Sequence, residues 1–207
     1  MTTDPRAIDA VFVNCPFDVD YAPTFDALLF TIHACGFRPR SARELDDASQ
    51  TRIDKLYGII EQCRYGIHDL SRTELDAVSR LPRFNMPLEL GIFLGAKRFG
   101  AEEQRAKRCL VLDVEPHRYQ RFVSDLAGMD IQDHGGEPAR AIERVRDWLA
   151  NVSRRKLVGS QKLQRAYAQF RADLPAWADD LGFDPARIPY VDFERILVTW
   201  LLESPAT

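Results

Sequence analysis

Long apolar runs, basic tails and glycine-rich loops are all missing from this chain of 207 residues. No run of about 18 apolar residues occurs, so we expect no membrane span, and the first residues lack the apolar core of a secretion signal. The net charge is −3, which does not favour nucleic acid as a partner. Neither Gly-x-Gly-x-x-Gly nor a Walker-type loop is present, which argues against a Rossmann dehydrogenase and a P-loop nucleotidase.

Cysteine is also scarce, and the four residues Cys15, Cys35, Cys63 and Cys109 show no C-x-x-C spacing. This scatter argues against a disulfide framework and a zinc site, and it predicts reduced, mostly buried thiols in a cytoplasmic protein. Cys15 follows a predicted strand, where a nucleophilic thiol is conceivable. No histidine lies near it in the sequence to act as a base, so a buried structural thiol is the favoured alternative.

What is present is a globular composition, 45% hydrophobic and 29% charged, in which short apolar runs alternate with helical patterns. This alternation predicts an α/β fold with a parallel sheet of about five strands and helices on both faces. Strands are expected at 10–14, 37–40, 65–70, 107–114 and 129–132. Helices are expected at 24–35, 49–63, 118–127 and 138–152, with a further one beginning near Glu89.

The strand–helix alternation stops after residue 152. We therefore expect an α/β nucleotide-binding domain over 1–152 and a C-terminal helical extension over 153–207, with helices near 162–178 and 191–202. Trp177 and Trp200 are among the apolar anchors of this extension. It can pack on the core, pair with a second copy of the chain or dock a partner, and the sequence leaves these alternatives open.

The segment 84–95 places one carboxylate, Glu89, in an otherwise apolar run at the start of a helix. Asn85 is expected to cap this helix, and Pro87 is tolerated in its first turn. The positive helix end would help to keep Glu89 ionised, although an exposed position on an amphipathic helix is the alternative. Gly91 and Gly95 lie one turn apart, and we expect them to permit close packing on the sheet.

Three motifs carry a resemblance to a known superfamily. They are Val-Phe-Val-Asn-Cys-Pro-Phe at 11–17, Gly-Ile-His-Asp-Leu-Ser at 66–71 and Asn-Met-Pro-Leu-Glu-Leu-Gly at 85–91. Over roughly residues 9–150 the chain resembles the TIR-like and nucleoside 2-deoxyribosyltransferase-like proteins, which share a flavodoxin-like doubly wound sheet. The resemblance implies cleavage of an N-glycosidic bond, most readily hydrolysis or cyclisation of NAD, and prokaryotic defence signalling is one setting that it suggests.

The resemblance also implies roles for individual residues. Glu89 takes the place of the catalytic glutamate, and Asp69 that of a ligand-contacting carboxylate at the end of the third strand. Asp69 can equally cap the turn that follows it. The loop 14–21 takes the place of the loop beside the ribose or base. The residues expected to bind substrate are Asn14, Pro16, Phe17, Asp18, Tyr21, Ser71 and Asn85.

Within this set the residue types leave alternatives open. Phe17 and Tyr21 can stack on a base or belong to the core, and Asp18 is a turn former first. His68 should point to the face opposite Asp69. No metal and no cofactor are expected, since NAD or another nucleotide would be the substrate or ligand. The alternatives to an enzyme are a non-catalytic nucleotide-binding sensor and a self-assembling signalling module, and a homo-oligomer is expected.

Overall fold

The computed structural model describes residues 9–44, 47–73, 75, 80 and 83–204. Its centre is a five-stranded parallel sheet with the strand order β2-β1-β3-β4-β5. The strands are β1 (Ala10–Asn14), β2 (Arg38–Arg40), β3 (Tyr65–Asp69), β4 (Arg108–Asp113) and β5 (Gln132–Asp133). This order confirms the expected doubly wound, flavodoxin-like α/β fold.

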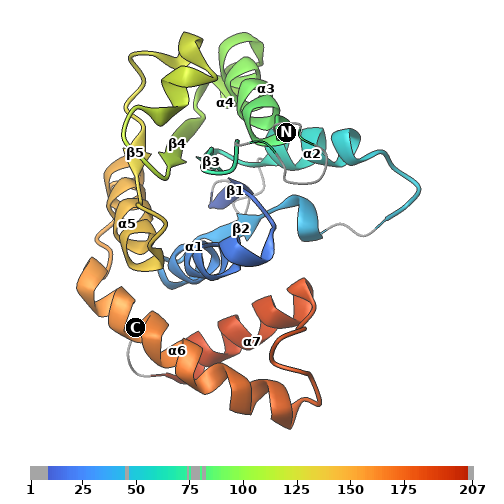
Figure 1. Ribbon diagram of the computed structural model, residues 1–207, viewed down its shortest axis with the longest axis vertical. Coiled ribbons are helices and arrows are strands. Elements are labelled where there is room, and N and C mark those ends of the chain that lie inside the picture. The colour runs from blue at the N-terminus through green and yellow to red at the C-terminus, as the bar shows by residue number, and fades with distance from the viewer. Residues whose placement is uncertain (1–8, 45–46, 74, 76–79, 81–82, 205–207) are drawn as a thin grey trace.

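Helices cover both faces of the sheet (Figure 1). On one face, α1 (Ala22–Ala34) and α5 (Pro138–Ser153) pack on β1 side chains such as Val11 and Val13. On the other face, α2 (Arg52–Gln62) and α3 (Asn85–Phe99) pack on Ala10 and Phe12. Successive residues of a strand point to opposite faces, so a fully covered strand is apolar along its whole length. The short helix α4 (Glu102–Arg105) follows α3.

The connection between β4 and β5 differs from expectation. Instead of a helix over 118–127, it forms two 3-10 turns, Arg118–Arg121 and Ser124–Leu126. His117 precedes them with φ of 61°, and Val123 between them has φ of −136°. Neither value is helical, so the chain cannot continue one helix through this segment. The other 3-10 turns are Val19–Tyr21 and Ala42–Glu44.

The C-terminal helices α6 (Ser160–Asp180) and α7 (Tyr190–Glu203) pack against α1, on its side away from the sheet (Figure 1). Phe30 of α1 lies within 6.1 Å, ring centre to ring centre, of Tyr167, Phe170 and Trp200. The Tyr167 hydroxyl donates a hydrogen bond of 2.9 Å to the carbonyl oxygen of Pro23. Of the three arrangements that the sequence leaves open, the structure shows packing on the core.

Two expectations about α3 are wrong. The helix begins at Asn85 with Phe84 as its N-cap residue, and no side chain caps it. A Cβ placed at Gly91 or Gly95 would meet nothing within 4 Å, so neither glycine serves close packing. The crowded glycine is instead Gly66 in β3, where a Cβ would lie 2.8 Å from both His68 and Phe93.

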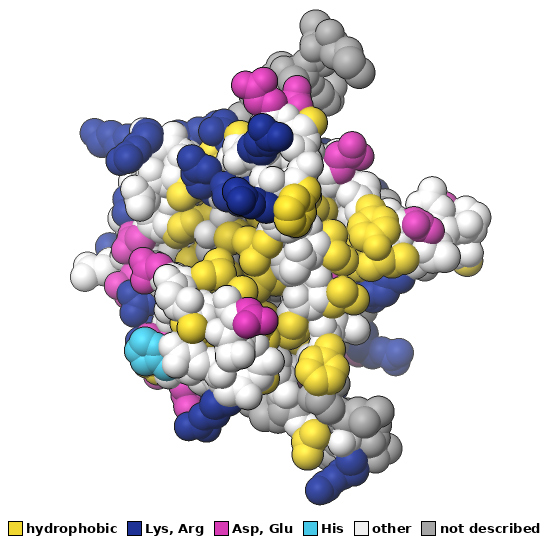
Figure 2. Space-filling model, turned by 90° about the horizontal axis from the view of Figure 1, so that it is seen from above, with side chains coloured by type: hydrophobic (Ala, Val, Ile, Leu, Met, Phe, Trp, Pro, Cys, Tyr) yellow, Lys and Arg dark blue, Asp and Glu magenta, His cyan; other side chains and the backbone are white. Residues whose placement is uncertain are grey.

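Some large apolar side chains of α2 and α3 stay exposed, among them Tyr57, Leu88 and Phe99. Figure 2 shows a face on which hydrophobic side chains gather across the middle, with Lys and Arg side chains grouped along one side. Apolar surface of this kind is a feature of self-associating proteins, and the expected homo-oligomer stays a prediction. No helix of the described residues has both the length and the apolar character needed to span a lipid bilayer.

Candidate functional site

The carboxyl ends of β1 and β3 mark the point at which the strand order reverses direction, which is where doubly wound sheets bind ligands. The buried Asn14 ends β1 there. Its side-chain amide donates a hydrogen bond of 2.8 Å to the carbonyl oxygen of Met86 and lies 3.0 Å from Nδ1 of His68. Asn14 thus ties the first turn of α3, and with it Glu89, to the end of the sheet.

Glu89 is buried, with 6% of its surface exposed, which excludes the alternative of an exposed helix position. Its side chain lines a cavity of about 190 Å³ together with Arg52, Leu56 and Asn85. Burial raises the pKa of Glu89 to about 7, and the nearby Arg52 only partly opposes this rise. Glu89 is the fifth residue of α3, and no acidic residue lies in the first turn of this helix, so the positive helix end does not keep the group ionised as expected. Within the described residues, no hydrogen-bond donor is assigned to its carboxylate.

Asp69 is fully buried at the end of β3, and its two oxygens accept four hydrogen bonds. The backbone N–H of Ser71 (2.8 Å) and the Ser71 hydroxyl donate to Oδ1. The Tyr21 hydroxyl (2.7 Å) and Nε2 of His134 (2.9 Å) donate to Oδ2. Burial alone would raise the pKa of Asp69, but the hydrogen bonds from His134, Ser71 and Tyr21 outweigh it and hold the pKa below its ordinary value.

The tautomer of His134 follows from its contacts. The backbone N–H of Gly136 donates to Nδ1 at 3.0 Å, so the ring proton is on Nε2, which faces Asp69. Ser71 Oγ also lies 3.4 Å from this same Nε2 atom. A Ser-His-Asp triad needs the two ring nitrogens to face different partners, so this cluster is not one. Its geometry positions the loop after β1 through Tyr21.

The Asp69 side chain and the helix that carries Glu89 lie on opposite faces of the sheet. Asp69 follows Tyr65 and Ile67 on the face covered by α1 and α5, whereas Glu89 comes from α3. Cys15 is close enough to both that each carboxylate raises the pKa of its thiol, although burial is the larger cause. The pKa lies well above the ordinary value, which disfavours the thiolate that a nucleophilic cysteine needs.

The structure divides the predicted substrate-binding residues into separate groups. Asn85 lines the Glu89 cavity, and Asn14 donates to Met86 in the first turn of α3, whereas Tyr21 and Ser71 belong to the Asp69 cluster. Pro16, which lies between Asn14 and Tyr21 in the sequence, is buried.

Phe17 and Asp18 line a second cavity. Asp18 caps the turn that leads to Tyr21 and lies 3.6 Å from Arg72 and 3.4 Å from Arg83. The expected turn-forming role of Asp18 is therefore confirmed.

Two buried polar residues at this edge of the sheet, His134 and Asp113, were not among the predicted site residues. His134 directly follows β5, and its position after a strand is the signal that could have found it. Asp113 ends β4 and accepts a hydrogen bond of 2.8 Å from Nε of Arg118. Nη2 of the same arginine donates a hydrogen bond of 2.6 Å to the carbonyl oxygen of Leu70. Burial raises the pKa of Asp113 despite Arg118. His68 points away from Asp69, as expected, and burial lowers its pKa to about 3.

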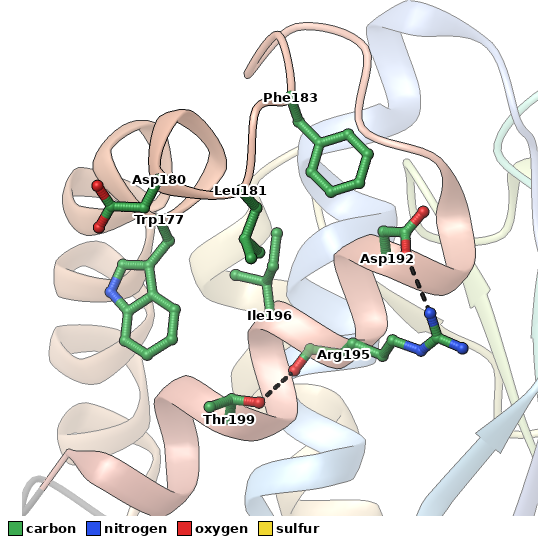
Figure 3. Close-up of a pocket in the computed structure, with 8 residues that line it drawn as sticks. All are labelled: Trp177, Asp180, Leu181, Phe183, Asp192, Arg195, Ile196 and Thr199. Carbon is green, nitrogen blue, oxygen red and sulfur yellow. Dashed lines mark hydrogen bonds and ion pairs between the residues drawn. The ribbon is translucent and has the colours of Figure 1, made fainter.

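Another cavity, of about 620 Å³, lies between α6 and α7. Figure 3 shows Trp177, Leu181 and Ile196 turned toward it, with Arg195 directed to Asp192 at 3.2 Å. All of its lining residues come from the C-terminal helices and the turn between them. It is therefore remote from the strand ends and contains no part of the Glu89 or Asp69 clusters.

Comparison with protein-family models, with curated proteins and with solved structures finds no match. The chemistry of the site therefore has to be argued from its own residues. Across the described ranges, no group of three or more His, Cys, Asp and Glu side chains is placed to hold a metal ion. What the geometry offers instead is one buried carboxylate, Glu89, in a small cavity at the ligand-binding edge of the fold.

Proposed function

We propose that the protein cleaves an N-glycosidic bond of a nucleotide, with Glu89 as the reacting carboxylate. The observation that carries the proposal is the burial of Glu89 beside a cavity, without an assigned hydrogen-bond donor among the described residues. Buried carboxylates are normally paired, and an unpaired one is a candidate for chemistry. The resemblance of the motif 85–91 to N-glycosidases supports the same role.

The chemistry follows from charge. When the bond between C1′ of the ribose and the base nitrogen breaks, the electron pair leaves with the base and positive charge develops on the sugar. The ionised Glu89 carboxylate can stabilise this cation or bond to C1′, after which water or a second acceptor completes the reaction. Because the pKa is about 7, both forms of Glu89 are present near neutral pH.

The surrounding residues have supporting roles in this proposal. Asn14 fixes the start of α3 through Met86, and Asn85 lines the Glu89 cavity, where its amide can bind a sugar hydroxyl. Asp69 acts as a positioning residue, because its oxygens already accept four hydrogen bonds. It holds Tyr21, and therefore the loop that would lie beside the substrate.

NAD is the first substrate to test, and a free nucleoside is the second. Purified protein is incubated with NAD, and nicotinamide release is followed by chromatography for the wild type, Glu89→Gln and the control Glu203→Gln, which changes an exposed carboxylate of α7. We expect Glu89→Gln to lower turnover roughly a hundredfold or more and Glu203→Gln to leave it unchanged. The wild-type rate should rise with pH through about 7, as Glu89 ionises.

Full turnover by folded Glu89→Gln would contradict the proposal. Nucleotide binding without product from either protein would favour the alternative of a non-catalytic sensor.

A further inference from the structure

A second cavity, of about 370 Å³, lies between the loop after β1 and the C-terminal helices. Phe17 and Phe25 line it from one side, Arg43 from the 3-10 turn after β2, and Leu174 and Phe193 from α6 and α7. Its volume is within the range of small-ligand sites. Unlike the larger cavity between α6 and α7, it combines the predicted ligand loop with several charged side chains.

Arg43 is the distinctive residue of this cavity. Its guanidinium carbon lies 5.6 Å from the ring centres of Phe17 and Phe25 and 5.9 Å from that of Tyr190. Three aromatic rings around one guanidinium hold its planar group in place without an acidic partner. Among the residues that the structure describes, no ion pair to Arg43 is formed.

The other charges that line the cavity are already compensated. Arg171 is paired with Asp26, and Asp18 is paired with Arg72 and Arg83. Asp26 feels the charge of Arg43 as well, but it forms its ion pair with Arg171. The Arg43 guanidinium therefore keeps N–H groups that can bind an anion such as a phosphate group with two hydrogen bonds. The exposed ring of Phe17 beside it offers a surface on which a base can stack.

The cavity and the Glu89 site lie at the same end of β1. Asn14, the last residue of β1, donates a hydrogen bond to the carbonyl oxygen of Met86 in α3, the helix whose Glu89 lines the first cavity. Phe17 and Asp18, which follow in the loop after β1, line the second cavity. A ligand bound across this end of the strand would place one part beside Glu89 and another beside Arg43.

We propose that this second cavity binds the phosphate-bearing part of a nucleotide, with Arg43 as the phosphate-binding residue and the C-terminal helices as one wall. The inference deepens the proposed function and rests on it for the class of ligand. It also assigns a role to α6 and α7, which complete a ligand site in addition to covering α1.

The test measures binding, so it does not depend on turnover. Isothermal titration calorimetry compares AMP, GMP, CMP and UMP with the four matching nucleosides, on the wild-type full-length chain and on Arg43→Gln. We expect at least one nucleotide to bind the wild type more tightly than its nucleoside does. In Arg43→Gln the affinity for that nucleotide should fall roughly tenfold or more, as loss of a charge-assisted contact predicts, while the affinity for the nucleoside changes little.

Two further variants control the design. Arg64→Gln removes another exposed arginine that lies 5.7 Å from a single ring, Tyr65, outside the cavity, and it should bind nucleotide as the wild type does. Ala186→Trp places a large ring at an exposed position of the cavity wall and should block binding without disturbing the core. Thermal melting of each variant checks that it is folded.

The proposal is overturned by any of three results. These are failure of all four nucleotides to bind at millimolar concentration, equal binding by the wild type and folded Arg43→Gln, or an equal loss of nucleotide and nucleoside binding in Arg43→Gln. Retained Arg43-dependent binding with no Glu89-dependent turnover would contradict the proposed enzyme alone, and turnover without Arg43-dependent binding would contradict this inference alone.

Discussion

Asp69 and Glu89 are two buried carboxylates near the same edge of one sheet, and they have opposite chemistry. Asp69 accepts four hydrogen bonds, and its pKa is lowered. Glu89 has no assigned donor among the described residues, and its pKa is raised to about 7. Burial acts on both groups in the same direction, so the hydrogen bonds decide the difference. A buried acid is therefore a reactive candidate only when its partners are also known.

The largest expected effect follows from removing Asp69, the carboxylate that accepts four hydrogen bonds. Asp69→Ala would leave the Tyr21 hydroxyl and Nε2 of His134 buried without an acceptor, and we expect it to lower the free energy of unfolding by about 3–5 kcal/mol. Urea denaturation at pH 7 measures this change. Asp20→Ala is the control, because that carboxylate is exposed and its ion pair with Arg72 is long, at 3.6 Å. An equally small loss in both variants would contradict the structural role of Asp69.

Glu89→Gln should raise the free energy of unfolding where Asp69→Ala lowers it, and the size of the gain should depend on pH. The folded-state pKa of Glu89 is raised from 4.5 to about 7, so the folded protein binds more protons than the unfolded chain between these values. Stability should therefore fall as pH rises through this window, by about 3 kcal/mol in total. Glu89→Gln removes this penalty and should be more stable than the wild type at pH 8.

Urea denaturation of both proteins at pH 5 and at pH 8 checks the second prediction. The stability difference between Glu89→Gln and the wild type should be large at pH 8 and small at pH 5. A stability difference that did not change with pH would mean that the pKa of Glu89 is not raised in the folded protein. The contrast with Asp69 would then be wrong.

The smallest expected effect tests whether the stability of the α3 backbone is independent of the ionisation of Glu89. Gly91 is exposed on α3, and an added methyl group would meet nothing within 4 Å. Gly91→Ala should therefore stabilise the protein by about 0.5–1 kcal/mol through helix propensity alone. Thermal melting at pH 5 and at pH 8 should show the same gain. A gain that changed with pH, or a loss, would show that the backbone near Glu89 is coupled to its ionisation.

The fold was largely predictable because its signals are local. Alternation of short apolar runs with helical patterns indicated four of the strands to within two residues at each end, and the fifth as a short edge strand. The helix predicted over 118–127 does not form because two consecutive non-helical residues, Phe122 and Val123, interrupt an otherwise suitable pattern. The prediction that Asn85 caps the helix was wrong because a helix can begin one residue earlier or later without any change in its apolar pattern.

The two carboxylates of the candidate site could be predicted from the sequence, but their surroundings could not. Glu89 and Asp69 both stood out as polar residues beside apolar runs, and the edge of the sheet on which they gather followed from the parallel topology. Their separation onto opposite faces required the orientation of β3 and α3. His134, 65 positions from Asp69 along the sequence, gave no local signal of its contact with that carboxylate.

By itself, the sequence determined the strands, the helices other than the one predicted over 118–127, the parallel sheet and the presence of an isolated carboxylate at the start of α3, because patterns with periods of two and 3.6 involve residues that are close together in the chain. Only the tertiary structure decided the pKa of each carboxylate, the pairing of Tyr21 and His134 with Asp69, and the wall that α6 and α7 add around Arg43. The reason is that burial and hydrogen bonding depend on residues far apart in the chain, which are neighbours only after folding.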